Sequence, residues 1–134
     1  MLGADPMSPA QPTLLIADDD AVVRSMLSLT LDHQFDIVGA AGDSDQAIAL
    51  AQAAQPDVAL IDVQMPGGGL RALQGIADVS PETAAVMLSA DEFEPMVREL
   101  MIAGAMSYVR KGIAPADLTE MLHRAIRARP ACAA

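Results

Sequence analysis

The sequence predicts an α/β fold, a doubly wound parallel sheet of five strands with five helices. Short apolar runs alternate along the chain with segments whose apolar residues recur at helical spacing. Continuous apolar runs of this kind are typical of parallel strands buried on both faces. With 134 residues, 52% of them hydrophobic and only 2% aromatic, the chain is expected to form one domain around an aliphatic core that contains methionine.

We expect this domain to cover residues 13–128, between a flexible leader at residues 1–12 and a flexible tail at residues 129–134. The leader contains three prolines among small residues, a composition that propagates neither helix nor strand. The tail is too short to form a further domain.

The first apolar run, residues 14–17, predicts a strand that is followed by a helix. One aspartate of the Asp18–Asp20 cluster is expected to cap the N-terminus of this helix. The helix is expected to end at Asp32-His33, and residues 35–40 predict the second strand. The positions that define the helix recur at helical spacing: Val22, Val23, Met26, Leu27 and Thr30.

The next helix is expected over Ser44–Ala54. Asp43 and the residues that follow it offer good N-capping chemistry, and Pro56 ends the helix. The apolar run at residues 58–61 predicts the third strand.

Glycines and prolines divide the next part of the chain. Gly67–Gly69 is expected to form a flexible loop before a helix over residues 70–79, which Ser80-Pro81 breaks. Residues 83–88 predict the fourth strand.

A fourth helix is expected over Glu92–Ala103, with Gly104 as a left-handed stop and the fifth strand at residues 106–109. The residues of this helix that we expect to face the core are Met96, Val97, Leu100 and Met101. Pro115 predicts the first turn of the last helix. Its apolar face consists of Leu118, Met121, Leu122, Ala125 and Ile126, and its last turn carries His123, Arg124, Arg127 and Arg129.

Polar side chains stand at the ends of four predicted strands: Asp18, Asp19 and Asp20 after the first, Asp62 after the third, Ser89 after the fourth and Lys111 after the fifth. Open parallel sheets bind their ligands at the carboxyl ends of the strands. Carboxylates, a hydroxyl and an ammonium group should therefore meet at one edge. This set suits a divalent cation and a phosphoryl group.

The acidic residues have more than one interpretation. Three adjacent carboxylates repel one another, by about 4 kcal/mol for a pair at ~4 Å and an intermediate dielectric. A hard cation would relieve this repulsion, so Asp18, Asp19 and Asp62 are candidate Mg²⁺ ligands. Asp20 is expected to cap the helix or to face water. Asp62 is also a candidate nucleophile, because a carboxylate can form an acyl phosphate.

Composition excludes some classes of function. The formal net charge of −10 gives no electrostatic footprint for nucleic acid or anionic lipid. The single cysteine, Cys132, has no partner for an intramolecular disulfide and fits a reducing compartment. We see no secretory signal and no apolar run of the ~20 residues that cross a bilayer. We therefore expect a cytoplasmic protein without membrane contact.

Taken together, these motifs resemble the receiver domain of two-component response regulators, which share their fold with chemotaxis regulators. The resemblance covers residues 13–128 and implies a flavodoxin-like strand order of 2-1-3-4-5. The motifs stand in the family's order along the chain: Leu-Ile-Ala-Asp18-Asp19, Leu-Ile-Asp62-Val-Gln-Met65-Pro66, Met-Leu-Ser89-Ala90 and Tyr108-Val-Arg-Lys111.

The resemblance implies a metal site and a phosphoacceptor. Asp62 matches the aspartate that is phosphorylated. Asp19 matches a direct ligand of Mg²⁺, and Asp18 matches a ligand that acts through water. Gln64 stands where the family supplies a backbone carbonyl to the metal.

It also implies a switch. Lys111 matches the lysine that pairs with the acceptor carboxylate and then with the phosphoryl group. Ser89 matches a hydroxyl that binds a phosphoryl oxygen, and Tyr108 the aromatic residue whose rotamer follows it. Taken singly, each of these residues has an ordinary explanation. Lys111 is then a solvated strand end, Ser89 a helix cap, and Tyr108 part of the packing at the sheet edge.

Two departures from the family pattern concern the backbone. The triple glycine after Pro66 makes this loop one residue shorter than is common in the family. Gly112 replaces a proline that often follows the lysine in a cis bond, which leaves the isomer of Lys111-Gly112 open.

The function implied is a phosphorylation-dependent signalling switch in a two-component system or phosphorelay. A sensor histidine kinase or phosphotransfer protein would donate the phosphoryl group. The fourth helix, fifth strand and last helix would contact an effector domain or partner protein, and a homodimer is left open. Such a domain catalyses its own phosphorylation and dephosphorylation but is not a turnover enzyme.

Two alternatives remain. One is a haloacid-dehalogenase-like phosphatase, although its Asp-x-Asp motif would require an acid at Gln64. The other is a receiver-like binding module that ignores phosphate, although such modules usually lose an acidic or lysine position that this chain retains.

Overall fold

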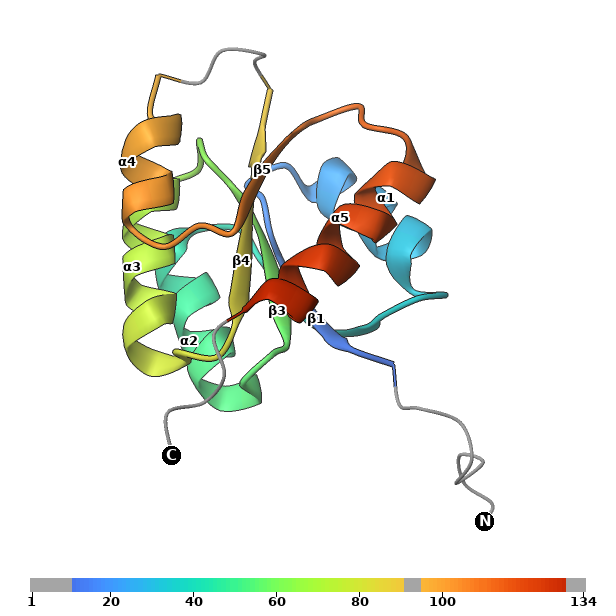
Figure 1. Cartoon of the computed structure of the whole chain (residues 1–134), viewed down its shortest axis with the longest axis horizontal. Helices are drawn as coiled ribbons and strands as arrows, with labels where there is room; N and C mark the ends of the chain where they lie inside the picture. Colours follow the sequence, from blue (N-terminus) through green and yellow to red (C-terminus); the bar gives the residue numbers. More distant parts are fainter. Residues whose placement is uncertain (1–10, 91–94, 130–134) are drawn as a thin grey trace.

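A computed structural model describes residues 11–90 and 95–129. In this part of the chain, strands and helices alternate as predicted (Figure 1). Their bounds are β1 (Thr13–Ala17), α1 (Ala21–Leu31), β2 (Asp36–Ala41), α2 (Ser44–Ala54), β3 (Val58–Asp62), α3 (Gly69–Val79), β4 (Ala84–Ser89), α4 (Val97–Ile102), β5 (Ser107–Arg110) and α5 (Pro115–Ala128).

The strands form one parallel sheet in the order β2-β1-β3-β4-β5, which confirms the predicted fold and strand order. Helices α2, α3 and α4 cover one face, and α1 and α5 cover the other (Figure 1). Alternate residues of each central strand enter the two cores, so that Ala59 and Ile61 face one while Val58 and Leu60 face the other. This two-sided burial explains why the strands are continuously apolar.

Local capping explains the bounds of the first two helices. Asp20 accepts hydrogen bonds from the amides of Val22 and Val23, and this confirms its expected role as a cap. Asp43 Oδ1 accepts from the amide of Gln46 at 2.8 Å, so α2 begins at Ser44 as predicted.

The buried face of α1 differs from the predicted one. Val22 and Met26 are 66% and 61% exposed, and Thr30 is exposed as well. Val23 and Leu27 are half-buried, and Leu31 is fully buried. The face of α1 that packs on the sheet is therefore shifted by one position from the predicted face. The apolar stripe of α1 is wider than the surface through which the helix contacts the sheet.

In α4, Leu100 is buried as predicted, but Met101 is 44% exposed. The helix begins at Val97, and residues 92–94 of its predicted range lie outside the described residues. Leu100 is the buried residue of this short helix of six residues.

Other elements begin or end within one or two residues of their predicted bounds. Phe35 precedes β2 and is buried, with its amide donating to the carbonyl of Leu31. Pro12, expected in the leader, accepts from the amide of Asp36 at 2.8 Å. Residues 1–10 and Cys132 lie outside the described residues. Over 11–90 and 95–129, none of the helices has the length and apolar character that a membrane span requires.

Asp57 joins three elements at the amino edge of the sheet. Its Oδ2 accepts from the amide of Thr13 at 2.8 Å and from the Thr13 hydroxyl at 3.1 Å. Its Oδ1 accepts from Arg129, the residue after α5, at 3.1 Å. Burial alone would raise the pKa of Asp57, but the hydrogen bonds from Thr13 and Arg129 outweigh it and lower the pKa.

We predict that Asp57→Ala destabilises the domain by about 1 kcal/mol at neutral pH, since these bonds end on a charged but partly exposed group. A carboxyl whose pKa is lowered in the folded state stabilises the fold above its ordinary pKa, and this contribution disappears as the pH falls through the lowered value. Urea unfolding between pH 7 and the acid range measures the difference. The exposed Asp78→Ala is the control, and an equal loss in both variants would contradict the prediction.

Candidate functional site

Four predicted site residues meet at the carboxyl edge of the sheet. Asp62 and Ser89 are the last residues of β3 and β4, and Asp18 and Lys111 directly follow β1 and β5. Parallel pairing in register brings these strand ends together, with Asp62 opposite Leu88. The sequence predicted this convergence correctly.

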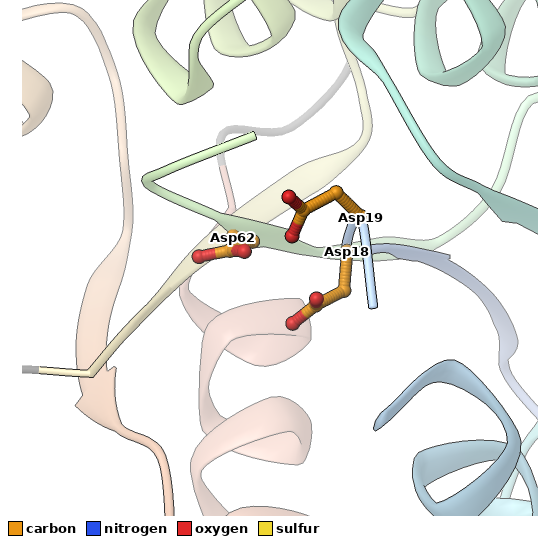
Figure 2. A group of neighbouring side chains, drawn as sticks. All are labelled: Asp18, Asp19 and Asp62. Atoms are coloured by element: carbon orange, nitrogen blue, oxygen red, sulfur yellow. The ribbon is translucent and has the colours of Figure 1, made fainter. Parts of the chain in front are cut away.

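Three carboxylates form a cluster at this edge. One oxygen each of Asp18, Asp19 and Asp62 lies within 4.8 Å of the others (Figure 2). Asp18 is completely buried and Asp62 is 2% exposed, whereas Asp19 is exposed. Two carboxylates of the cluster are therefore buried, and the third is open to solvent.

Lys111 supplies the positive charge of the site. Its Nζ lies 2.9 Å from Asp18 Oδ2 and 3.3 Å from Asp62 Oδ2. Its backbone amide donates to the carbonyl of Ser89 at 2.6 Å, which fixes the lysine beside the end of β4. The described residues contain no cis peptide bond, so the bond to Gly112 is trans, and Gly112 has a φ of 91°.

The remaining carboxylate oxygens accept from backbone amides. Asp18 Oδ1 accepts from Asp20 at 2.9 Å, and Asp62 Oδ1 accepts from Gln64 at 3.1 Å. Asp18 Oδ2 is fully buried and pairs with the Lys111 ammonium, 2.9 Å away. One ammonium does not balance three carboxylates, and their oxygen donors suit a hard cation such as Mg²⁺.

The pKa values of Asp62 and Lys111 are both raised in the folded protein. Burial raises the pKa of Asp62 and outweighs the lowering effect of the hydrogen bond from the Gln64 amide; the charge of Asp18 raises this pKa further, and Lys111 lowers it. Burial alone would lower the pKa of Lys111, but Asp18 and Asp62 outweigh it and raise the pKa. One ammonium thus faces two buried carboxylates, and the cluster retains negative charge.

Ser89 and Tyr108 lie on neighbouring strands. Ser89 is 2% exposed and pairs with Arg110, while Tyr108 pairs with Met87. The Tyr108 side chain packs partly buried against the core on the side of α4. The structure therefore brings Ser89 to the site and places Tyr108 beyond it, toward α4.

Sequence reasoning missed one contact of the site. Ser44 was expected only as part of a helix cap, but its fully buried hydroxyl bonds the loop that follows Asp62. The serine gives no local signal for this, since its partners are 22 and 24 residues away in sequence.

A family model described as the response regulator receiver domain matches residues 14–123. The chain belongs to this family. The receiver domain is 37% identical over 115 residues to the uncharacterized transcriptional regulatory protein YxjL of Bacillus subtilis, which covers 84% of this chain and 53% of YxjL. It is 37% identical over 117 residues to the response regulator GacA of Pseudomonas aeruginosa, covering 85% of this chain and 53% of GacA.

Among solved structures, the receiver domain is similar to the response regulator domain of Thermotoga maritima CheB, with a TM-score of 0.81 and 26% identity. The match covers 90% of this chain and all of that one. The chain spans about half the length of the relatives YxjL and GacA. Response regulators are signalling proteins of two-component systems, and this favours a signalling role over the dehalogenase-like phosphatase.

We predict that Asp62→Asn raises the melting temperature of the metal-free domain at pH 7. The amide is nearly isosteric and removes a buried charge that Asp18 repels. A carboxyl whose pKa is raised on folding destabilises the fold once it ionises, so the gain should shrink as the pH falls toward the ordinary aspartate range. Thermal unfolding in a chelator tests this, with Asp78→Asn as the exposed control. A lower melting temperature for Asp62→Asn at pH 7 would refute it.

Proposed function

We propose that this receiver domain is a phosphorylation-dependent switch, in which Asp62 accepts a phosphoryl group from a histidine kinase or phosphotransfer protein. The observation that supports it best is the position of Asp62. This carboxylate ends a central strand within the cluster of three carboxylates, and it shares the ammonium of Lys111 with the buried Asp18. An anionic nucleophile can react with an anionic phosphoryl group only where positive charge is close at hand.

In the proposed reaction, a carboxylate oxygen of Asp62 attacks the phosphorus atom of a phosphohistidine. The P–N bond breaks, its electron pair stays on the imidazole, and an acyl phosphate forms on Asp62. Lys111 would then pair with a phosphoryl oxygen, at the expense of its contact with Asp62. Attack of water on the acyl phosphate would later release inorganic phosphate and restore the carboxylate.

The residues that would hold Mg²⁺ are Asp19 as a direct ligand, Asp18 through water, Asp62, and the backbone carbonyl of Gln64. The bound ion would neutralise charge on the phosphoryl oxygens. The cluster of three carboxylates and the exposed position of Asp19 support this assignment.

For the output, we propose that Ser89 binds a phosphoryl oxygen and that Tyr108 responds by a change of rotamer. The face formed by α4, β5 and α5 would then contact an effector domain or a partner protein. The packing of Tyr108 on the α4 side supports this direction. An effector domain also fits the relatives, which are about twice as long and include a protein named as a transcriptional regulator.

We predict that the wild-type domain, incubated with a small acyl-phosphate donor and Mg²⁺, gains the mass of one phosphoryl group on Asp62, and that Asp62→Asn gains none. Intact-mass spectrometry with peptide mapping measures both. Asp20→Ser, which keeps a helix-capping side chain, is the control and should be phosphorylated normally. Equal uptake by Asp62→Asn would exclude the acceptor, and no uptake by the wild type would favour the phosphate-independent binding module.

We predict that Mg²⁺ raises the melting temperature of the wild type and that Asp19→Ala largely abolishes this rise. Binding to the folded state alone stabilises it, by about 2.7 kcal/mol at 100 times the dissociation constant. The neighbouring Asp20→Ser should respond to Mg²⁺ like the wild type. Calorimetry with and without Mg²⁺ decides, and an undiminished rise in Asp19→Ala would contradict the ligand assignment.

A further inference from the structure

We propose that Ser44 is a positioning residue of the site. Its hydroxyl holds the loop between β3 and α3, and thereby the segment that carries Gln64 against Asp62. This inference rests on the proposed Mg²⁺-dependent phosphorylation of Asp62, and it names a residue on another helix that sets the metal affinity.

Ser44 contacts the loop through both its backbone and its side chain. Its amide donates to the carbonyl of Pro66 at 3.0 Å. Its hydroxyl lies 2.8 Å from the carbonyl of Gly68 and 3.2 Å from that of Pro66. A hydroxyl has one proton to donate, so the shorter contact with Gly68 is the stronger bond. Two carbonyls of the loop are thus bound by one residue at the start of α2.

The glycines of the loop permit this close contact. Gly67 has a φ of 88°, and a Cβ atom there would lie 2.4 Å from the Ser44 hydroxyl oxygen. On the other side of the loop, a Cβ atom at Gly69 would lie 2.7 Å from Val63 Cα and 2.8 Å from the carbonyl oxygen of Asp62. The loop is therefore packed between Ser44 and the backbone of the phosphoacceptor strand, where larger residues do not fit.

Hydrogen bonds connect the loop to the acceptor. The amide of Gly69 donates to the carbonyl of Val63 at 2.9 Å, and the amide of Gly68 donates to that of Met65 at 2.7 Å. Within the turn that these bonds close, the amide of Gln64 donates to Asp62 Oδ1. A loop fixed at Pro66 and Gly68 thus fixes the segment that contacts the reactive carboxylate.

The hydroxyl of Ser44 is not needed to cap its own helix. Asp43 already caps α2 through the amide of Gln46. The hydroxyl is fully buried, and its bonds go to the loop. The loop before α3 contains Gly67 and Gly68, which have no side chains of their own to complete the turn. The serine supplies contacts from outside the loop.

The test compares Mg²⁺ binding of the wild type, Ser44→Ala and Asp43→Ala by calorimetry. Asp43→Ala removes the cap of the same helix, and the side-chain hydrogen bonds of Asp43 go to Gln46, so this variant controls for loss of α2 stability. We expect Ser44→Ala to bind Mg²⁺ about tenfold more weakly, as is usual when a group that orients a metal ligand is lost. Asp43→Ala should lower the melting temperature but keep the Mg²⁺ affinity.

Two further measurements separate positioning from general stability. In Ser44→Ala, the Mg²⁺ concentration for half-maximal phosphorylation should rise about tenfold, while the rate at saturating Mg²⁺ is kept. In a chelator, hydrogen exchange at the Gln64 amide should be faster than in the wild type. Ser44→Cys, which keeps the size but has only a weak donor, should behave like Ser44→Ala and replaces it if that variant does not fold.

If both Ser44 variants keep the Mg²⁺ affinity and the hydrogen-exchange rate of the Gln64 amide, the inference is overturned. The proposed function stays intact in that case as long as the wild type binds Mg²⁺ and is phosphorylated. If the wild type itself binds no Mg²⁺, the proposed metal site fails. In that case faster Gln64 exchange in the chelator would still support the positioning of the loop, and unchanged exchange would reject it.

Discussion

The ion pairs of Lys111 with Asp18 and Asp62 are the interaction on which the site depends. Two carboxylates, both almost completely buried, end adjacent strands of the sheet. An unpaired buried charge is costly, and removal of one partner from such a cluster leaves the other uncompensated. A single ammonium pairs with both carboxylates but does not balance the three carboxylates of the cluster, so the site attracts a cation.

The sheet makes this arrangement possible because all of its strands run in the same direction. Their carboxyl ends lie at one edge, where the apolar cores under both faces stop and polar side chains reach solvent. At the opposite edge, Asp57 connects β1 and β3 to the end of α5. One edge is thus held by internal hydrogen bonds, and the other carries the groups that can react.

Contacts from two separate segments of the chain hold the surroundings of Asp62 in place. The backbone amide of Lys111 is fixed by the carbonyl of Ser89, and the loop after Asp62 is bound by Ser44. These contacts involve backbone groups, whose positions vary less than those of long side chains. In the proposed switch, these contacts would keep the geometry around Asp62 while its charge changes, and the side chains of Ser89 and Tyr108 would move.

The sequence by itself determined the α/β fold, the strand order through its family motifs, the cap of α2 at Asp43, and the meeting of Asp18, Asp62 and Lys111 at one edge. These features follow from local patterns, namely apolar runs, capping residues and polar residues at strand ends. Only the tertiary structure decided that Leu31 rather than Met26 is buried in α1, that Met101 is exposed, and that Ser44 binds the loop after Asp62. Such contacts join residues far apart in the chain, and they depend on how a helix is rotated and seated on the sheet, which helical periodicity does not specify.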